Sequence, residues 1–346
     1  MNKFAHSSFD AVVTATIGLA LMIALPGILD DFDLIQATLF IVMSILAVSL
    51  GFIWGFGGIL CFGQASFFGL GVYTYSVAAL NFGDSTLPVV LSVLVPAAFA
   101  VLMGYLMFYG RLSDVYMAVI TLTMTLILFN LFNSTSGPEW TIGNAPLGGF
   151  NGIPSVPIIS LPWNPGEVVS SRGMFYLSLG VLLLVYLGLR GVLASKVGRV
   201  IVAIRENEQR ALLLGYDVRA YKLFTFTLGG AIAGLAGCLF ANWGSYASPT
   251  IFGLAQSAQI IIWVIVGGHG TLVGPIVGCV VIQWLTAQIG TQQTFNANLV
   301  LGVILVSFVL IAPKGLVPGI GQIFERLRSR RIAAKLAQPT PAESKE

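Results

Sequence analysis

Side chains that could carry out chemistry are scarce in this chain. It contains no G-x-x-x-x-G-K-[ST] sequence, so it has no P-loop with which to bind ATP. It has no C-x-x-C pair, and two histidines, His6 and His269, are too few for a metal cluster. No Asp, Glu, Lys or Arg occurs between Leu223 and Ala312. Because ion-driven pumps keep ionisable groups inside their apolar segments, a membrane protein with this pattern either conducts passively or draws energy from another subunit.

The cysteines and the second histidine lie among apolar residues. Cys61, Cys238 and Cys279 are interpreted as buried small hydrophobic side chains rather than as a disulfide or a metal site. His269 lies between Gly268 and Gly270. It is either an interfacial polar group beside closely packed backbone or a residue with a gating or ligand role, and both interpretations stay open.

The composition is that of an integral membrane protein. Of the 346 residues, 56% are hydrophobic and only 9% are charged, whereas soluble domains carry about 25% charged residues. The 40 glycines are compatible with membrane helices, which tolerate glycine readily. These values exclude a soluble enzyme, a disordered chain and a secreted disulfide scaffold.

Ten apolar runs are candidates to span a bilayer core about 30 Å thick. They cover approximately residues 11–29, 35–53, 59–81, 87–109, 115–133, 174–193, 222–243, 254–268, 271–289 and 298–313. The runs show no period-two alternation, which favours helices over a β-barrel. The eighth run is short, so a count of nine is also compatible with the pattern. We therefore predict an all-α, polytopic helical bundle of about ten transmembrane helices.

The basic residues predict the orientation. With both termini in the cytoplasm, the cytoplasmic side holds Lys3, Arg111, seven basic residues in 190–222 and seven in 314–345, which is sixteen of the seventeen. Only Arg172 is left outside. Such a bias is what the positive-inside rule requires.

The chain divides into two parts. Residues 1–324 are expected to form the transmembrane domain, and residues 325–346 a basic, largely disordered cytoplasmic tail. Within the domain, an external loop at about 134–173 holds six of the fifteen prolines, and a charged cytoplasmic loop covers about 194–221.

The charged loop contains the most informative sequence, residues 198–216. We expect a short helix, a turn near Asn207, a second helix and a glycine stop at Gly215. Apolar residues such as Val200 and Ile204 share one face of the first helix. The same pattern would also suit an amphipathic segment lying on lipid headgroups.

This loop closely resembles the coupling loop of the branched-chain amino acid permease family of ABC importers, which docks into a cleft on a cytoplasmic ATPase. Further stretches resemble motifs of that family in the family's order. They are 62–74 (F-G-Q-A-S-F-F-G-L-G-V-Y-T), 115–122 (V-Y-M-A-V-I-T-L), 148–153 (G-G-F-N-G-I), 267–275 (G-G-H-G-T-L-V-G-P) and 313–316 (P-K-G-L). The first departs from the family at its start, where Cys61-Phe62 replaces a polar pair. The resemblance covers roughly residues 35–320, and the long external loop favours the "M"-type permease.

The resemblance implies a transport subunit rather than an enzyme. Its expected partners are a homologous second permease, two cytoplasmic ATPases that bind ATP and Mg, an external or periplasmic binding protein, and membrane lipid, but no nucleic acid. No cofactor is expected in this chain. A bacterial inner membrane is the expected location. The implied ATPase-coupling residues are Arg199, Arg205, Glu206, Asn207, Glu208, Ala211 and Gly215.

The cargo is not fixed by the resemblance. Branched-chain amino acids are expected, but urea and short-amide importers share these motifs. A passive channel or stand-alone secondary transporter is the alternative from another class, and the two-helix cytoplasmic loop speaks against it.

The candidate translocation path is polar but neutral. It comprises Gln64, Ser66, Tyr73, Thr74, Thr121, Thr125, Gln259 and Gln283. Thr121 and Thr125 share a helix face, which suits either a path lining or an interhelical hydrogen bond. Two glycine-rich stretches accompany these residues, as helix breaks or as sites of tight packing. Their glycines are Gly63, Gly69, Gly71, Gly267, Gly268, Gly270 and Gly274.

The orientation gives a direct prediction. A cysteine introduced at Pro154 or Gly166 should react with a membrane-impermeant thiol reagent in intact cells, because both positions lie in the predicted external loop. A cysteine at Asn207 should react only after the membrane is permeabilised. Labelling of position 207 from outside would reverse the predicted topology.

Overall fold

The computed structural model describes residues 29–290 except 138, 162 and 163, together with 16, 18, 20, 22, 25–27, 302 and 315–319. Its α-helices are α2 (Asp31–Gly55), α3 (Gln64–Phe82), α4 (Thr86–Tyr109), α5 (Asp114–Ser134), α6 (Ser171–Ala194), α7 (Lys196–Glu206), α8 (Glu208–Leu213), α9 (Val218–Gly244), α10 (Leu254–Gly267) and α11 (Val273–Gly290). Two short 3-10 helices lie at Gly149–Asn151 and Pro249–Phe252. The strands are β1 (Thr141–Ile142), β2 (Ala145–Pro146), β3 (Ile153–Pro154), β4 (Ser160–Leu161), β5 (Asn164–Val168) and β6 (Tyr246–Ala247).

Helices lie where the second to ninth apolar runs predict them. Five of the described helices, α2, α4, α5, α6 and α9, are long and apolar enough to cross a membrane. The helices α10 and α11 are apolar but shorter. The first and tenth predicted spans fall largely outside the described residues, as does the predicted tail over 325–346, so the count of ten and the positions of the termini stay predictions.

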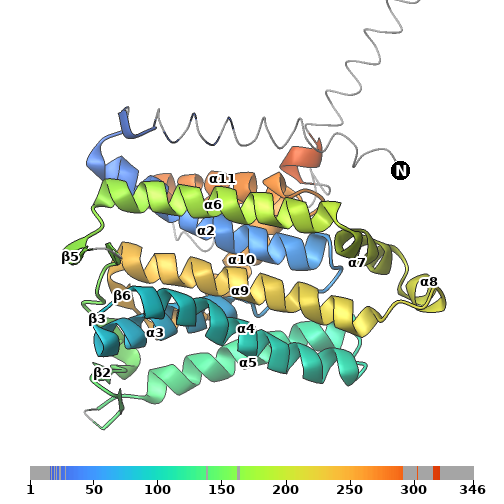
Figure 1. Ribbon diagram of the computed structural model, residues 1–346, viewed down its shortest axis with the longest axis horizontal. Coiled ribbons are helices and arrows are strands. Elements are labelled where there is room, and N and C mark those ends of the chain that lie inside the picture. Colours follow the sequence, from blue (N-terminus) through green and yellow to red (C-terminus); the bar gives the residue numbers. More distant parts are fainter. Residues whose placement is uncertain are drawn as a thin grey trace, which may run out of the picture.

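Helix α2 is the central element of the bundle. It packs against α6, α9, α10 and α11 and is buried along most of its length, whereas α4, α5 and α6 expose most of theirs. The other main contact surfaces join α3, α4 and α9 to one another. Figure 1 shows α6 and α11 along one edge of the bundle and α5 along the opposite edge.

Glycine permits a close crossing between α3 and α9. A Cβ atom at Gly71 would overlap the backbone of Gly234, and one at Gly237 would overlap the Phe68 carbonyl oxygen. Both α3 glycines of the predicted glycine-rich stretch, Gly69 and Gly71, lie inside an unbroken helix. They therefore act in packing, as small residues at helix interfaces do.

The predicted external loop adds a small amount of β structure to the helical fold. Three antiparallel pairs form, β1 with β2, β3 with β6, and β4 with β5. The all-α prediction misses them, because strands of two to five residues leave no readable alternation. Side chains on the helix ends hold the loop: the Asn81 side chain bonds the backbone of Ile142 and Asn144, and the Tyr75 hydroxyl donates to the Pro157 carbonyl at 3.1 Å.

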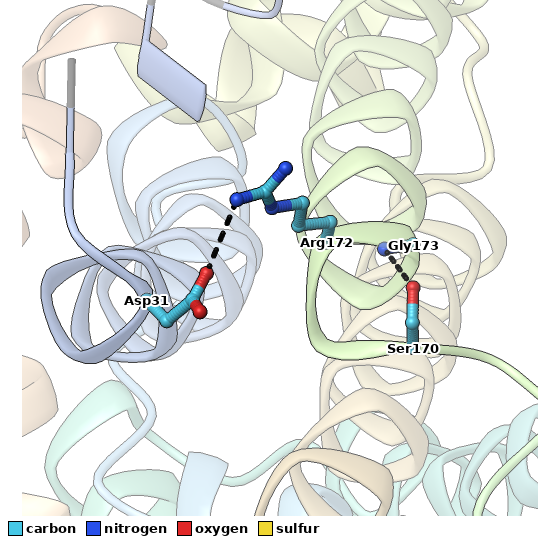
Figure 2. Close-up of polar contacts among 4 residues, drawn as sticks. All are labelled: Asp31, Ser170, Arg172 and Gly173. Carbon is cyan, nitrogen blue, oxygen red and sulfur yellow. Dashed lines mark hydrogen bonds and ion pairs between the residues drawn. The ribbon is translucent and has the colours of Figure 1, made fainter. Parts of the chain in front are cut away.

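Two polar contacts lie at the helix ends beside this loop (Figure 2). Ser170 caps α6 by accepting a hydrogen bond from the Gly173 N–H at 3.2 Å. Arg172, the one basic residue predicted to lie outside, forms an ion pair with Asp31 at the start of α2, with 3.5 Å between the atoms. Both side chains are well exposed, so this pair contributes little to stability.

The loop and the short helices α7 and α8 lie at opposite ends of the bundle (Figure 1). This arrangement agrees with the predicted placement of residues 134–173 and 194–221 on opposite sides of a membrane.

Candidate functional site

Local sequence determines the α7–α8 helix pair. The Ser195 hydroxyl accepts a hydrogen bond from the Gly198 N–H at 3.3 Å and caps α7. Asn207 then ends α7, and its side chain caps α8 by accepting a hydrogen bond from the Arg210 N–H at 2.8 Å. After α8, Gly215 adopts φ +87°, a conformation that side-chain-bearing residues rarely take. The predicted helix, turn, helix and glycine stop are confirmed.

The apolar face of this pair is used within the protein. Val200, Ile204, Ala211 and Val218 form a small buried cluster, with Tyr221 of α9 packed against it. The cluster holds α7 and α8 onto the start of α9. The alternative interpretation, in which the apolar face of α7 lies on lipid, is therefore not favoured.

The charged residues of the pair have different surroundings. The Glu208 carboxylate accepts from the Lys222 ammonium at 2.6 Å, which ties α8 to α9. Arg199 is exposed and donates to the Ala194 carbonyl at 3.2 Å. Arg205 reaches back into the bundle, where it donates to the Gly55 carbonyl at the end of α2 and also pairs with Glu206.

Two exposed leucines were missed by the sequence analysis. At the end of α8, Leu213 is 89% exposed and Leu214 is 71% exposed. Large exposed apolar side chains at the tip of a short helix are typical of a contact surface. The signal was present in the sequence as three leucines immediately before Gly215.

The two glycine-rich stretches meet in the structure. They contain the connections Phe56–Gly63, between α2 and α3, and Gly268–Leu272, between α10 and α11. A Cβ atom at Gly55 would overlap the His269 carbonyl oxygen, and the rings of Trp54 and His269 stack with centroids 5.4 Å apart. Burial, and then the nearby charge of Arg205, lower the pKa of His269 below its usual value, so the imidazole is neutral at pH 7.

Each predicted glycine has an identifiable place. Gly63 lies against the Thr121 backbone, and Gly69 against the Phe252 ring. Gly267 and Gly274 pack on one another where α10 and α11 meet, Gly268 has φ +98°, and Gly270 has open space around it. Gly315, from the P-K-G-L stretch, lies against Gly268, so two motifs distant in sequence are in contact.

Four of the candidate path residues point into the subunit interior. Gln64 is 1% exposed, and its amide donates to the Ser49 hydroxyl at 2.7 Å and the Gly229 carbonyl at 3.2 Å. Thr121 is also buried, and its hydroxyl accepts from the Phe62 N–H at 3.2 Å. Ser66 and Thr125 are buried and bond nearby backbone carbonyls. These contacts join α2, α3, α5 and α9.

Two other candidates line a cavity of about 590 Å³ near the external loop. The Tyr73 and Thr74 side chains contribute to its wall, together with Asn81 and Phe132. Most of the remaining lining is apolar. The Tyr73 ring contacts those of Phe132 and Phe252, which also stack on each other, and its hydroxyl has no hydrogen-bond partner in the described part of the chain. The last two candidates, Gln259 and Gln283, are half-buried on α10 and α11.

A different polar stripe lies on the exposed face of α5. Tyr116, Thr123 and Asn130 are spaced seven residues apart and are all exposed, and Ser134 follows on the same face. Exposed apolar side chains such as Val119 and Ile127 alternate with them. The sequence analysis chose Thr121 and Thr125 on this helix, which face inward. The seven-residue spacing of polar residues in an apolar run was the signal that would have found the stripe.

The fold and these sites define a class: a polytopic helical membrane protein with a folded pair of short helices at one end and no charged residue from 223 to 312. Comparison with known proteins agrees. The family model for the permease component of branched-chain amino acid transport systems matches residues 34–312, and the chain belongs to this family. It is a transport component, not an enzyme.

Individual relatives support the "M"-type prediction. The chain is 29% identical over 326 residues to the high-affinity branched-chain amino acid transport system permease protein LivM of Escherichia coli, covering 87% of this chain and 73% of the relative. It is 24% identical over 346 residues to the probable LivM permease of Methanocaldococcus jannaschii, covering 83% and 94%. The probable LivH permease of that organism matches at 29% over 154 residues, 42% of this chain and 48% of the relative. No solved structure matches the chain.

The glycine stop yields a test that separates backbone strain from steric overlap. A Cβ atom at Gly215 would meet nothing within 4 Å, so only the positive φ resists a side chain there. Gly215→Val should therefore loosen α8 at a cost of about 1 kcal/mol or more, and Gly215→Asn should cost less, since Asn tolerates left-handed backbone better.

Hydrogen exchange of the α8 amides would measure this effect. Gly270→Val is the matched control, because position 270 is equally open and has no positive φ. Equal exchange in the Val and Asn variants of Gly215 would show that the backbone conformation does not hold the end of α8.

Proposed function

We propose that this chain is the path-forming subunit of a binding-protein-dependent ABC importer for branched-chain amino acids in a bacterial inner membrane. It pairs with a homologous permease, two ATPases dock on its cytoplasmic face, and an external binding protein delivers the cargo. The observation that carries the proposal is the α7–α8 pair. It is a folded, charged docking element at the end of a bundle whose sequence from 223 to 312 has no charge with which to couple transport to ions.

The proposed contact with the ATPase centres on the tip of α8. Leu213 and Leu214 provide the exposed apolar anchor, and the same loop carries exposed charged residues such as Arg199 and Glu206. An apolar centre with a charged rim is the usual anatomy of a protein interface. Three residues serve the contact indirectly by holding α8 in place. Asn207 caps its start, Ala211 packs in the buried cluster, and Gly215 ends the helix.

The proposed path runs along the exposed face of α5. The stripe of Tyr116, Thr123 and Asn130 supplies neutral polar groups on this face, although Thr123 and Asn130 also bond their own helix backbone, and we place it in a passage shared with the second permease. Its hydroxyl and amide groups are neutral. Such a surface suits transient passage of a zwitterion rather than tight binding, and it leaves selection mainly to the binding protein.

The mostly apolar cavity beside the external loop supports an amino acid with an aliphatic side chain over urea. Tyr73 and Thr74 lie in its wall, at the end of the bundle where the cargo would enter. The neutral α5 stripe alone would suit either cargo.

The docking surface predicts a specific loss. Replacing Leu213 and Leu214 together with Ala should reduce co-purification of the ATPase by roughly tenfold or more, since anchor residues at interface centres each contribute above 1 kcal/mol. Leu184→Ala on α6 is the control, because Leu184 is 72% exposed but lies outside the coupling loop. Full retention of the ATPase by the double variant would place docking elsewhere.

Uptake measurements test the function itself. Vesicles containing both permeases and the binding protein should accumulate radiolabelled leucine only when the ATPase and ATP are present. Unlabelled isoleucine and valine should compete, whereas urea and acetamide should not. Accumulation without the ATPase would favour a channel or secondary transporter, and competition by urea would favour the amide importers.

A further inference from the structure

The C-terminal end of α2 depends on a side chain from α7. The last four carbonyl groups of a helix have no partner within the helix. At this end, the carbonyls of Phe52, Ile53 and Trp54 accept hydrogen bonds from the N–H groups of residues 56–59. The fourth carbonyl, that of Gly55, accepts from the Arg205 guanidinium. A cation is also the favourable charge at a helix C-terminus.

The aliphatic part of Arg205 lies on the α2–α3 connection. Gly58 has φ +68°, and a Cβ atom there would lie 2.8 Å from Cγ and 3.3 Å from Cβ of Arg205. Glycine at position 58 thus leaves room for the arginine stem. The connection is also close to α9, because a Cβ atom at Gly57 would lie 2.7 Å from the Thr225 methyl group.

The same end of α2 contacts the α10–α11 connection. His269 presents its carbonyl to Gly55 and its ring to Trp54. We call this meeting point the junction: Trp54–Gly58, Arg205 and Gly268–Gly270. Arg205 is the only residue from the coupling loop in this set.

We propose that Arg205 is a positioning residue that locks the coupling helices to the junction, so that α7, the α2–α3 connection and the α10–α11 connection move as one body during transport. Releasing it would remove the side-chain partner of the part-buried Gly55 carbonyl, so this hydrogen bond favours the arrangement in which α7 stays attached to the end of α2. The inference rests on the proposed docking of an ATPase at α7–α8. It assigns Arg205 an inward role, whereas Leu213 and Leu214 provide the outward one.

A reversible disulfide tests the lock. The 3.3 Å spacing between a Cβ at position 58 and the Cβ of Arg205 is a few tenths of an ångström below the usual disulfide range. Gly58→Cys combined with Arg205→Cys would be assembled with the ATPase, second permease and binding protein in vesicles. Leucine uptake and ATP hydrolysis would be measured before and after oxidation, and again after reduction.

We expect Arg205→Cys alone, which removes the guanidinium without placing a side chain at the positive φ of Gly58, to bind the ATPase and hydrolyse ATP normally but to take up leucine about tenfold more slowly. The reduced double variant should be at least as slow. Oxidation should restore uptake per ATP, because the disulfide replaces the lock. Arg205→Cys alone, under the same oxidant, controls for pairing with Cys61. Lys196→Gln, which removes an exposed charge from the same helix, should leave the uptake per ATP unchanged.

Three results would overturn the proposal. Normal uptake by the reduced variant would show that the lock is not needed. An oxidised variant that hydrolyses ATP but still transports slowly would show that the contact must open. Loss of ATPase binding in Arg205→Cys would assign Arg205 to docking. If the unmodified chain itself binds no ATPase, the proposed function fails instead, which is a separate outcome.

Discussion

Backbone N–H and C=O groups inside a membrane bundle have no water to bond, so every interruption of a helix must find partners within the protein. That constraint is most demanding at the end of α2, where the chain leaves a buried helix and re-enters the bundle as α3. The Gly55 carbonyl finds its partner in Arg205, the Phe62 N–H in Thr121, and Gln64 bonds Ser49 and Gly229. These partners come from α7, α5, α2 and α9. The hydrogen bonds that satisfy the α2–α3 connection therefore also link most of the bundle.

The same constraint explains why the glycine-rich motifs converge. Gly55 and His269 touch, Gly267 and Gly274 touch, and Gly315 lies on Gly268. Close approach of backbones lets short connections be satisfied by neighbouring chain rather than by lipid or water. With no charged side chain between 223 and 312, the proposed function assigns to this hydrogen-bonded and closely packed framework the transmission of force from α7 and α8 into the bundle.

Much of this could be predicted from sequence, since hydropathy marks the helices, and Asn207 and Gly215 mark the α7–α8 pair by ordinary capping chemistry. The direction of individual side chains could not. Arg205 shares its loop with outward-facing Arg199, yet turns inward to bond the Gly55 carbonyl. Local sequence does not reveal this partner, because it lies 150 residues away along the chain. Thr121 and Thr125 differ from Thr123 only in helix phase, and that phase is set by packing of α5 against the 3-10 helix Pro249–Phe252 and α3 rather than by local sequence.

The central claim is that α7 and the junction form one rigid unit, and a distance measurement between spin labels at Val197 and Gly270 tests it most directly. Val197 is exposed on α7, and Gly270 has open space around it, so both positions accept a label. In a complex that takes up leucine, the distance distribution should be the same without nucleotide and with bound ATP. A shifted or split distribution in the ATP-bound state would contradict the account.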